Sequence, residues 1–144
     1  MRSAAATIKR ASEIEKMRAS GRVLVDILEV LQAEIRPGVS TGDLNPPAER
    51  MIRDAGAIPS FKGYGSNPPF PASICASIND EVVHGIPSRD RRLADGDIIS
   101  VDIGCILDGG HADCARTWTV GSVSSAESRL IGATRQAMEA GISA

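Results

Sequence analysis

The sequence lacks the features that define several classes of protein. Its formal charge is only −2, so it has no electrostatic footprint for nucleic acid or for a membrane surface. No apolar run approaches the roughly 20 residues that span a bilayer. Residues 1–11 lack the apolar core of a secretory signal. These absences favour a cytoplasmic protein that binds neither nucleic acid nor membrane.

Cysteine and histidine are also scarce, with three cysteines and two histidines among 144 residues. The three cysteines are odd in number and lie in apolar runs, which is typical of reduced core residues and not of a disulfide framework. A chain of this length is normally one domain. We expect residues 1–11 to form a flexible arm and residues 12–144 to form the domain.

Hydrophobic periodicity predicts helices and strands of an α+β protein. A capping box from Ser12 to Glu15 begins a long helix that Arg36-Pro37-Gly38 ends. The next helix begins either after Thr41 as N-cap or with Asn45 as cap and Pro46 at its first position. Strands are expected at residues 74–78, 82–86, 97–107 and 111–121, with hairpin turns at 79–80 and 108–109, and a last helix at 126–142.

Two aspartates in the expected hairpin point to a metal site. Asp102 lies in an apolar run, where a short charged side chain gains nothing and loses water. If Asp108-Gly109 is a two-residue turn, Asp113 faces Gly104 and lies on the same sheet face as Asp102. Two carboxylates there supply hard oxygen ligands, and Gly104 leaves room beside them. A three-residue turn would instead put Asp113 on the opposite face, and turn-flanking aspartates are often only solvated or capping.

The motifs around these aspartates resemble those of type I methionine aminopeptidases, which have the pita-bread metallopeptidase fold. The resemblance is carried by His84-Gly85-Ile86-Pro87, by the run from Gly96 to Asp102, and by the run from Asp108 to Asp113. It extends over nearly the whole chain. It implies one pseudo-symmetric half of the fold, with helices on one face of an antiparallel sheet.

The resemblance implies a metal-dependent enzyme that removes N-terminal methionine when the next residue is small. Family members hold two divalent ions with two Asp, one His and two Glu, and Asp102 and Asp113 match the two aspartates. Co²⁺, Mn²⁺, Fe²⁺ and Zn²⁺ all suit such ligands. The other three ligands belong to the second half of the fold, so we expect this chain to be the N-terminal half, inactive by itself and served by a complementary C-terminal half.

The resemblance also assigns residues to the substrate, which is the N-terminal methionine of nascent polypeptides near the ribosome. His84 matches the histidine that contacts the substrate near the scissile amide, where it could stabilise developing charge. Tyr64, Phe70 and Cys75 are the candidates for the methionine pocket. His111 shares the Asp113 face by alternation, but the family pattern does not use it.

Two other functions remain open from the sequence. One is a pita-bread binding module without peptidase activity, although a pure binder would not need both aspartates. The other is hydrolysis of the prolidase or aminopeptidase P kind on the same fold. Those relatives usually carry an extra N-terminal domain, and only eleven residues precede the expected first helix.

Overall fold

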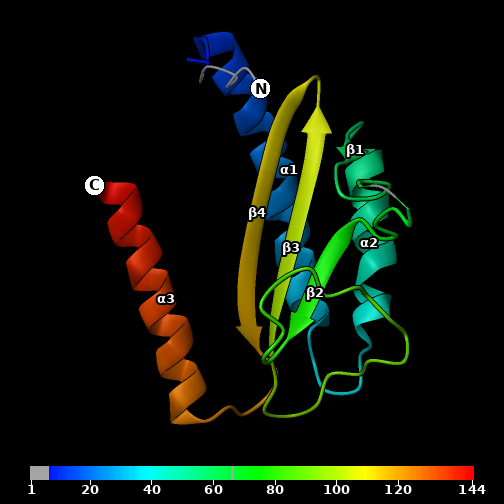
Figure 1. The fold of residues 1–144 in the computed structure, drawn as a ribbon, viewed down its shortest axis with the longest axis vertical. Coiled ribbons are helices and arrows are strands. Elements are labelled where there is room, and N and C mark those ends of the chain that lie inside the picture. The colour runs from blue at the N-terminus through cyan, green and yellow to red at the C-terminus, as the bar shows by residue number, and fades with distance from the viewer. Residues whose placement is uncertain (1–6, 66) are drawn as a thin grey trace.

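The computed structural model describes residues 7–65 and 67–144, which form three helices and four strands (Figure 1). In chain order these are α1 (Ala11–Glu34), α2 (Thr41–Asp54), β1 (Ile58–Pro59), β2 (Ile74–Ile78), β3 (Ile98–Leu107), β4 (Gly110–Thr119) and α3 (Ser125–Ser143). None of the described helices combines the length and apolar content that crossing a bilayer requires.

Strand β3 is the centre of an antiparallel sheet. It pairs with β4 along its whole length on one side, and with β2 and the short β1 on the other. In the described part of the chain, the second edge of β4 pairs with no strand.

The two faces of the sheet differ in character because side chains alternate along each strand. On one face Ile99, Val101, Ile103 and Cys105 are fully buried against α1 and α2, and with Leu24 and other helix residues they form the core. The opposite face carries the polar positions of β3, including Ser100 and Asp102. The expected α+β arrangement with helices on one face is therefore confirmed for α1 and α2 (Figure 1).

Helix α1 begins earlier than the sequence predicted. It starts at Ala11, and the Arg10 N–H donates to the Glu13 carboxylate at 2.9 Å, so the cap lies two residues before Ser12. Residues 7–10 precede the helix, and the rest of the expected arm lies outside the described residues. Further along, Ser20 Oγ donates to the Gly110 carbonyl at 2.8 Å and fixes α1 against the start of β4.

Helix α2 begins at Thr41 with Ser40 as N-cap, so both predicted starts are wrong and Pro46 and Pro47 lie inside the helix. A proline cannot donate its backbone bond to the preceding turn, which normally disfavours a helix interior. Here the donors that begin the helix are all satisfied by Ser40, Asp43 and two carbonyls of the 88–91 loop. That capping offsets the bonds that the prolines cannot make.

The strand predicted at residues 82–86 is absent, and this segment is irregular. Gly85 docks on β2 instead: its carbonyl accepts from the Ala76 N–H at 2.8 Å and its N–H donates to Ser77 Oγ at 3.0 Å. His84 just before it has φ of 62°, which a regular strand does not allow. The alternation of apolar residues in this segment was therefore misleading.

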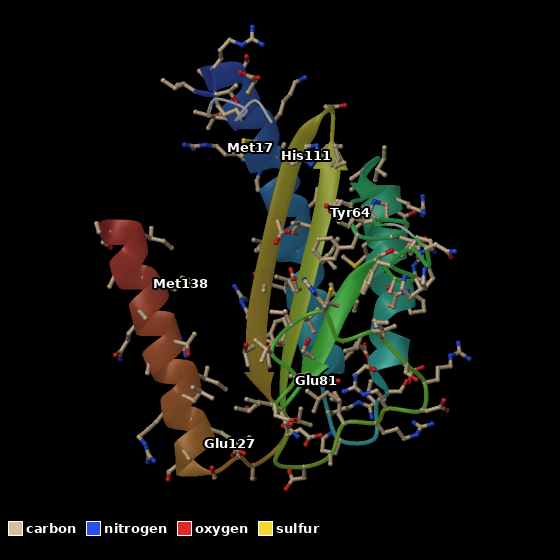
Figure 2. The ribbon with its side chains drawn as sticks, in the orientation of Figure 1. Met17, Tyr64, Glu81, His111, Glu127 and Met138 are labelled. Atoms are coloured by element: carbon tan, nitrogen blue, oxygen red, sulfur yellow. The ribbon has the colours of Figure 1, made fainter. Side chains whose placement is uncertain are left out.

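Helix α3 confirms the last predicted helix but contributes no buried residue. Ser124 caps it, accepting from the Glu127 N–H, and Glu127 reaches back to the Ser124 N–H at 2.7 Å. The helix stands away from the sheet on the β4 side, and Met138 on it is exposed (Figures 1 and 2).

Candidate metal centre

The hairpin between β3 and β4 has the two-residue turn on which the metal prediction depended. Leu107 pairs with Gly110, and between them Asp108 and Gly109 have φ of 50° and 78°. Two left-handed residues in succession are the geometry that matches the twist of a tight hairpin. The predicted turn is confirmed.

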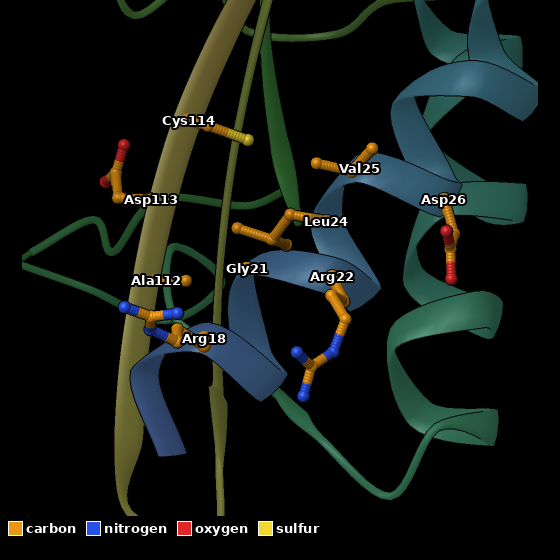
Figure 3. Close-up of a pocket in the computed structure, with 9 residues that line it drawn as sticks. All are labelled: Arg18, Gly21, Arg22, Leu24, Val25, Asp26, Ala112, Asp113 and Cys114. Carbon is orange, nitrogen blue, oxygen red and sulfur yellow. The ribbon is translucent and has the colours of Figure 1, made fainter. Parts of the chain in front are cut away.

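The register that follows from this turn brings Asp102 and Asp113 to one face. Asp113 pairs with Gly104, two residues from Asp102, so the two aspartates are diagonal neighbours. Figure 3 shows the Asp113 carboxylate and the Cys114 sulfur on opposite sides of β4. The predicted convergence of the two aspartates on one face is confirmed, and this face is the one that α1 and α2 leave uncovered.

A groove of about 450 Å³ lies on the other side of β4, against α1 (Figure 3). Arg18, Arg22 and Cys114 are among its lining residues. Gly21 also lines it, and nothing lies within 4 Å of the position that a Cβ there would take. The groove follows the helix-covered side of the strand, and Asp113 is among its lining residues, although its carboxylate lies on the other side of β4 (Figure 3).

Asp102 is held in an unfavourable environment for a charge. Burial raises the pKa of its carboxyl first, the Asp113 carboxylate raises it further, and His84 lowers it in part. Its Oδ1 is fully buried and accepts no hydrogen bond within the described part of the chain. A buried carboxylate oxygen without a partner carries a desolvation cost that a cation would remove.

These features fit a divalent cation, because two carboxylates with an unpartnered oxygen are the hard donors that such ions prefer. The fit is partial. Across residues 7–65 and 67–144, no group of three or more His, Cys, Asp or Glu side chains is arranged as a metal site. Asp102 and Asp113 can therefore supply part of a coordination shell.

Cys75 and His84 lie beside this pair. Cys75 is opposite Asp102 in the β2–β3 register and is buried, and burial with the two nearby carboxylates raises the pKa of its thiol to about 11. His84 is exposed and close enough to influence the Asp102 carboxyl. Four of the predicted site residues are thus gathered on one face of the sheet.

Gly85 explains how His84 is placed. A Cβ on Gly85 would lie 2.2 Å from the Ala76 carbonyl oxygen, so only glycine allows the segment to close onto β2. The Ser77 hydroxyl, which accepts from the Gly85 N–H, anchors the same point. No pattern in the sequence indicated this role for Ser77, because a serine in a strand has no distinctive spacing.

Tyr64 and Phe70 lie on the loop between β1 and β2. The Phe70 N–H donates to the Tyr64 carbonyl at 2.8 Å, so a backbone hydrogen bond joins the two residues. The Tyr64 side chain (Figure 2) is 78% exposed. Phe70 is half-buried. The structure therefore keeps this pair together on the loop and does not pack Tyr64 against Asp102 or Asp113.

The room expected beside Gly104 is already filled from the same loop. A Cβ at Gly104 would lie 2.4 Å from Ser60 Oγ and 2.8 Å from the Phe61 ring. Ser60, together with Asp113 and His111, also lines a second cavity of about 480 Å³. Ser60 and Phe61 are neighbours of the site that sequence reasoning missed, and the glycine at position 104 was the only signal of their approach.

Comparisons with known proteins agree with this arrangement. The profile of metallopeptidase family M24 matches residues 15–144. The methionine aminopeptidase of Clostridium acetobutylicum is 50% identical over 135 residues, which are 94% of this chain and 53% of that protein. Methionine aminopeptidase 1 of Mycobacterium tuberculosis is 48% identical over 136 residues, covering 94% of this chain and 50% of that protein.

Solved structures give the same result for the fold. Methionine aminopeptidase from Rickettsia prowazekii superposes with a TM-score of 0.87 at 38% identity, over 92% of this chain and 52% of that one. Prolidase from Pyrococcus furiosus superposes with a TM-score of 0.71 at 21% identity, over 85% of this chain and 34% of that one, which shows the fold alone. The pita-bread prediction is confirmed, and the chain spans about half the length of the curated relatives it matches.

Proposed function

The chain belongs to metallopeptidase family M24, and we propose that it supplies the metal-binding carboxylates of a methionine aminopeptidase. Membership of this family implies dependence on divalent metal. The observation that carries the proposal is the convergence of Asp102 and Asp113, with the buried Asp102 Oδ1 lacking a partner. Relatives 40–50% identical that are named methionine aminopeptidase support the choice of reaction.

In this proposal Asp102 and Asp113 hold two divalent ions, of Co, Mn, Fe or Zn, together with ligands from outside the described residues. Such ions supply Lewis acidity toward a peptide carbonyl and toward water. His84, close to the Asp102 carboxyl, donates a hydrogen bond to the scissile amide of the substrate and stabilises the charge that develops there. Tyr64, Phe70 and Cys75 form the wall that receives the methionine side chain.

The proposed substrate is the N-terminal methionine of nascent polypeptides with a small second residue, near the ribosome. The three free cysteines suit a reducing compartment such as the cytoplasm. Within the described residues one edge of β4 has no strand partner, and apolar residues of α3 are exposed; both suit a complementary half that adds the remaining ligands. The prolidase-like reaction is less well supported, because the Xaa-Pro dipeptidase of Bacillus anthracis is 26% identical and the prolidase of Pyrococcus furiosus 21% identical, against 40–50% for the methionine aminopeptidases.

The test compares the 144-residue polypeptide with a fusion to the segment of the Clostridium acetobutylicum enzyme that it does not match. Both are assayed with Mn²⁺ or Co²⁺ on a Met-Ala-Ser peptide. We expect methionine release from the fusion and little or none from the polypeptide alone, because the described residues bring only two carboxylates together. In the fusion, Asp113→Asn should abolish release, whereas His84→Ala should lower turnover and leave metal content nearly unchanged.

Two results would contradict the proposal. Robust release by the purified polypeptide alone would show that two carboxylates suffice or that other groups, such as His111 or a second subunit, complete the site. A folded, metal-loaded fusion that hydrolyses no Met-Ala-Ser peptide would show that the reaction is not methionine removal.

A further inference from the structure

Helix α2 holds both ends of the loop that runs from Ser60 to Ser73. Near its start, Lys62 Nζ donates to both Glu49 carboxylate oxygens, at 2.9 and 2.8 Å. At its end, the Ser73 N–H donates to Asn45 Oδ1 at 2.8 Å. Asn45 and Glu49 are four residues apart, so they lie on the same side of α2 one turn from each other.

Glu49 is the centre of this arrangement. Only 18% of its side chain is exposed, although Lys62 and Arg53, which both donate to it, are 43% and 56% exposed. The hydrogen bond from Lys62 lowers the pKa of the Glu49 carboxyl most, and Arg53 and Ser73 lower it further. The carboxylate is therefore ionised at neutral pH and binds two cations from different segments.

The same loop reaches the face of the sheet that carries the aspartates. The Ser60 N–H donates to the Gly104 carbonyl at 3.1 Å, and the Phe61 ring lies over Gly104, the residue paired with Asp113. Between the two anchors, the Gly63 N–H donates to the Phe70 carbonyl at 2.8 Å. The loop therefore connects α2 with the surroundings of Asp113.

We propose that Glu49 and Asn45 are positioning residues, which hold the 60–73 loop on α2 and thereby fix Tyr64 and Phe70 relative to the carboxylate face. The contacts of Glu49 with Lys62 and of Asn45 with Ser73 are called the loop clasp below. The clasp itself rests on the observed contacts, whereas its effect on substrate rests on the proposed function.

The loop clasp should affect local opening of the 60–73 loop and not global unfolding, so the measurement must report on local opening. A partly exposed ion pair contributes little to global stability. Opening of one loop, however, can be measured separately from global unfolding, because native-state proteolysis follows the population of the locally open form. The Lys62–Gly63 bond is a suitable probe, since trypsin cleaves after lysine and Lys62 is itself a member of the clasp.

The experiment measures the rate of tryptic cleavage at Lys62–Gly63 in the native 144-residue chain. We expect Glu49→Gln, which removes the charge but keeps the shape, to accelerate this cleavage about five-fold. Glu13→Gln is the matched control: it breaks the exposed Arg10–Glu13 pair on α1, away from the loop, and should leave the rate unchanged. An unchanged rate in Glu49→Gln would overturn the proposal.

Conservative variants separate the clasp from a general loss of structure. Lys62→Arg keeps both the cation and the cleavage site, so it should retain protection. Asn45→Asp keeps the acceptor for the Ser73 N–H and should also retain protection, whereas Asn45→Ala should lose it. Equal protection in Asn45→Asp and Asn45→Ala would overturn the role of Asn45, and equal urea midpoints across the set would show that the effects are local.

The fusion enzyme tests the effect on substrate. Glu49→Gln should raise KM for Met-Ala-Ser several-fold with little change in kcat, because the loop is placed to bind and not to react. A fall in kcat with KM unchanged would refute the positioning role. If the parent fusion shows no turnover, the proposed function fails, and the cleavage rates still decide whether the clasp exists.

Discussion

Replacement of Asp102 by Asn should stabilise the metal-free chain and remove its response to metal. The carboxylate is partly buried, its Oδ1 has no partner, and Asp113 lies diagonally beside it. Diagonal neighbours in a sheet are about 7 Å apart. Two unit charges at that distance repel by about 0.6 kcal/mol in water and about 2.4 kcal/mol at an effective dielectric constant of 20. Since Asn keeps the volume and loses the charge, we expect a gain on the order of 1 kcal/mol.

The assay is urea unfolding in EDTA and in Mn²⁺, followed by the fluorescence of Trp118, the only tryptophan, which packs against the core. Mn²⁺ at ten times its Kd should stabilise the parent by about 1.4 kcal/mol and leave Asp102→Asn unaffected. Asp108→Asn, in the left-handed turn position that Asn tolerates, is the control and should respond to Mn²⁺ as the parent does. The reasoning fails if Asp102→Asn is less stable than the parent in EDTA, or gains as much from Mn²⁺.

Three further outcomes follow from the contacts. Ser40→Ala removes the cap of α2 and should lower the free energy of unfolding, measured by urea titration, by about 1 kcal/mol. An unchanged free energy of unfolding would contradict this. Gly85→Ala places a Cβ 2.2 Å from the Ala76 carbonyl oxygen, so it should abolish the docking of the 82–86 segment, seen as faster amide exchange at Ala76. The pKa of the Glu49 carboxyl is lowered in the folded state. The stabilisation that the ionised carboxylate provides is therefore complete above pH 4.5 and is lost as the pH falls through the lowered pKa. The protection of the Gly63 amide, whose N–H donates to the Phe70 carbonyl within the loop, should therefore differ between parent and Glu49→Gln at neutral pH and converge in acid, and a constant difference would contradict the assignment.

The sequence was most informative where the residues of a turn and the apolar pattern of the flanking strands predicted the same structure. At the β3–β4 hairpin, Asp108-Gly109 specified a two-residue turn, and the alternation of apolar residues specified the same register. Because side chains alternate strictly, that one turn also decided which face carries Asp102 and Asp113. The placement of Asp102 and Asp113 on one face of the sheet was therefore predictable from the sequence.

Prediction failed where contacts distant in sequence decide the backbone. The 82–86 segment has the apolar residues of a strand, but Gly85 fits so closely on β2 that the segment docks through two hydrogen bonds and no ladder. Helix α2 contains Pro46 and Pro47, and carbonyls of the 88–91 loop accept from its first donors at Thr41 and Gly42. Neither the docking of Gly85 nor the help from that loop is visible in the local sequence.

The loop clasp was missed for a related reason. The sequence indicates Asn45 only as a possible helix cap, and Glu49 and Lys62 are typical of polar residues on a helix surface and in a loop. Their meaning depends on how the 60–73 loop returns to α2, which no periodicity records. Residues that act by holding others leave weaker signals in a sequence than residues that carry the chemistry.

The two-residue turn at Asp108-Gly109 has a consequence for how such a site can change during evolution. Insertion of one residue there, with the turn kept at two residues, would shift the pairing of β4 by one, turn its side chains over and send the Asp113 carboxylate toward α1, into the packing now made by Cys114. Insertion of two residues would preserve the orientation. Homologues should therefore tolerate insertion or deletion of an even number of residues at this turn far better than of an odd number. Whether the loop length is odd or even is then conserved together with the carboxylates that the turn orients.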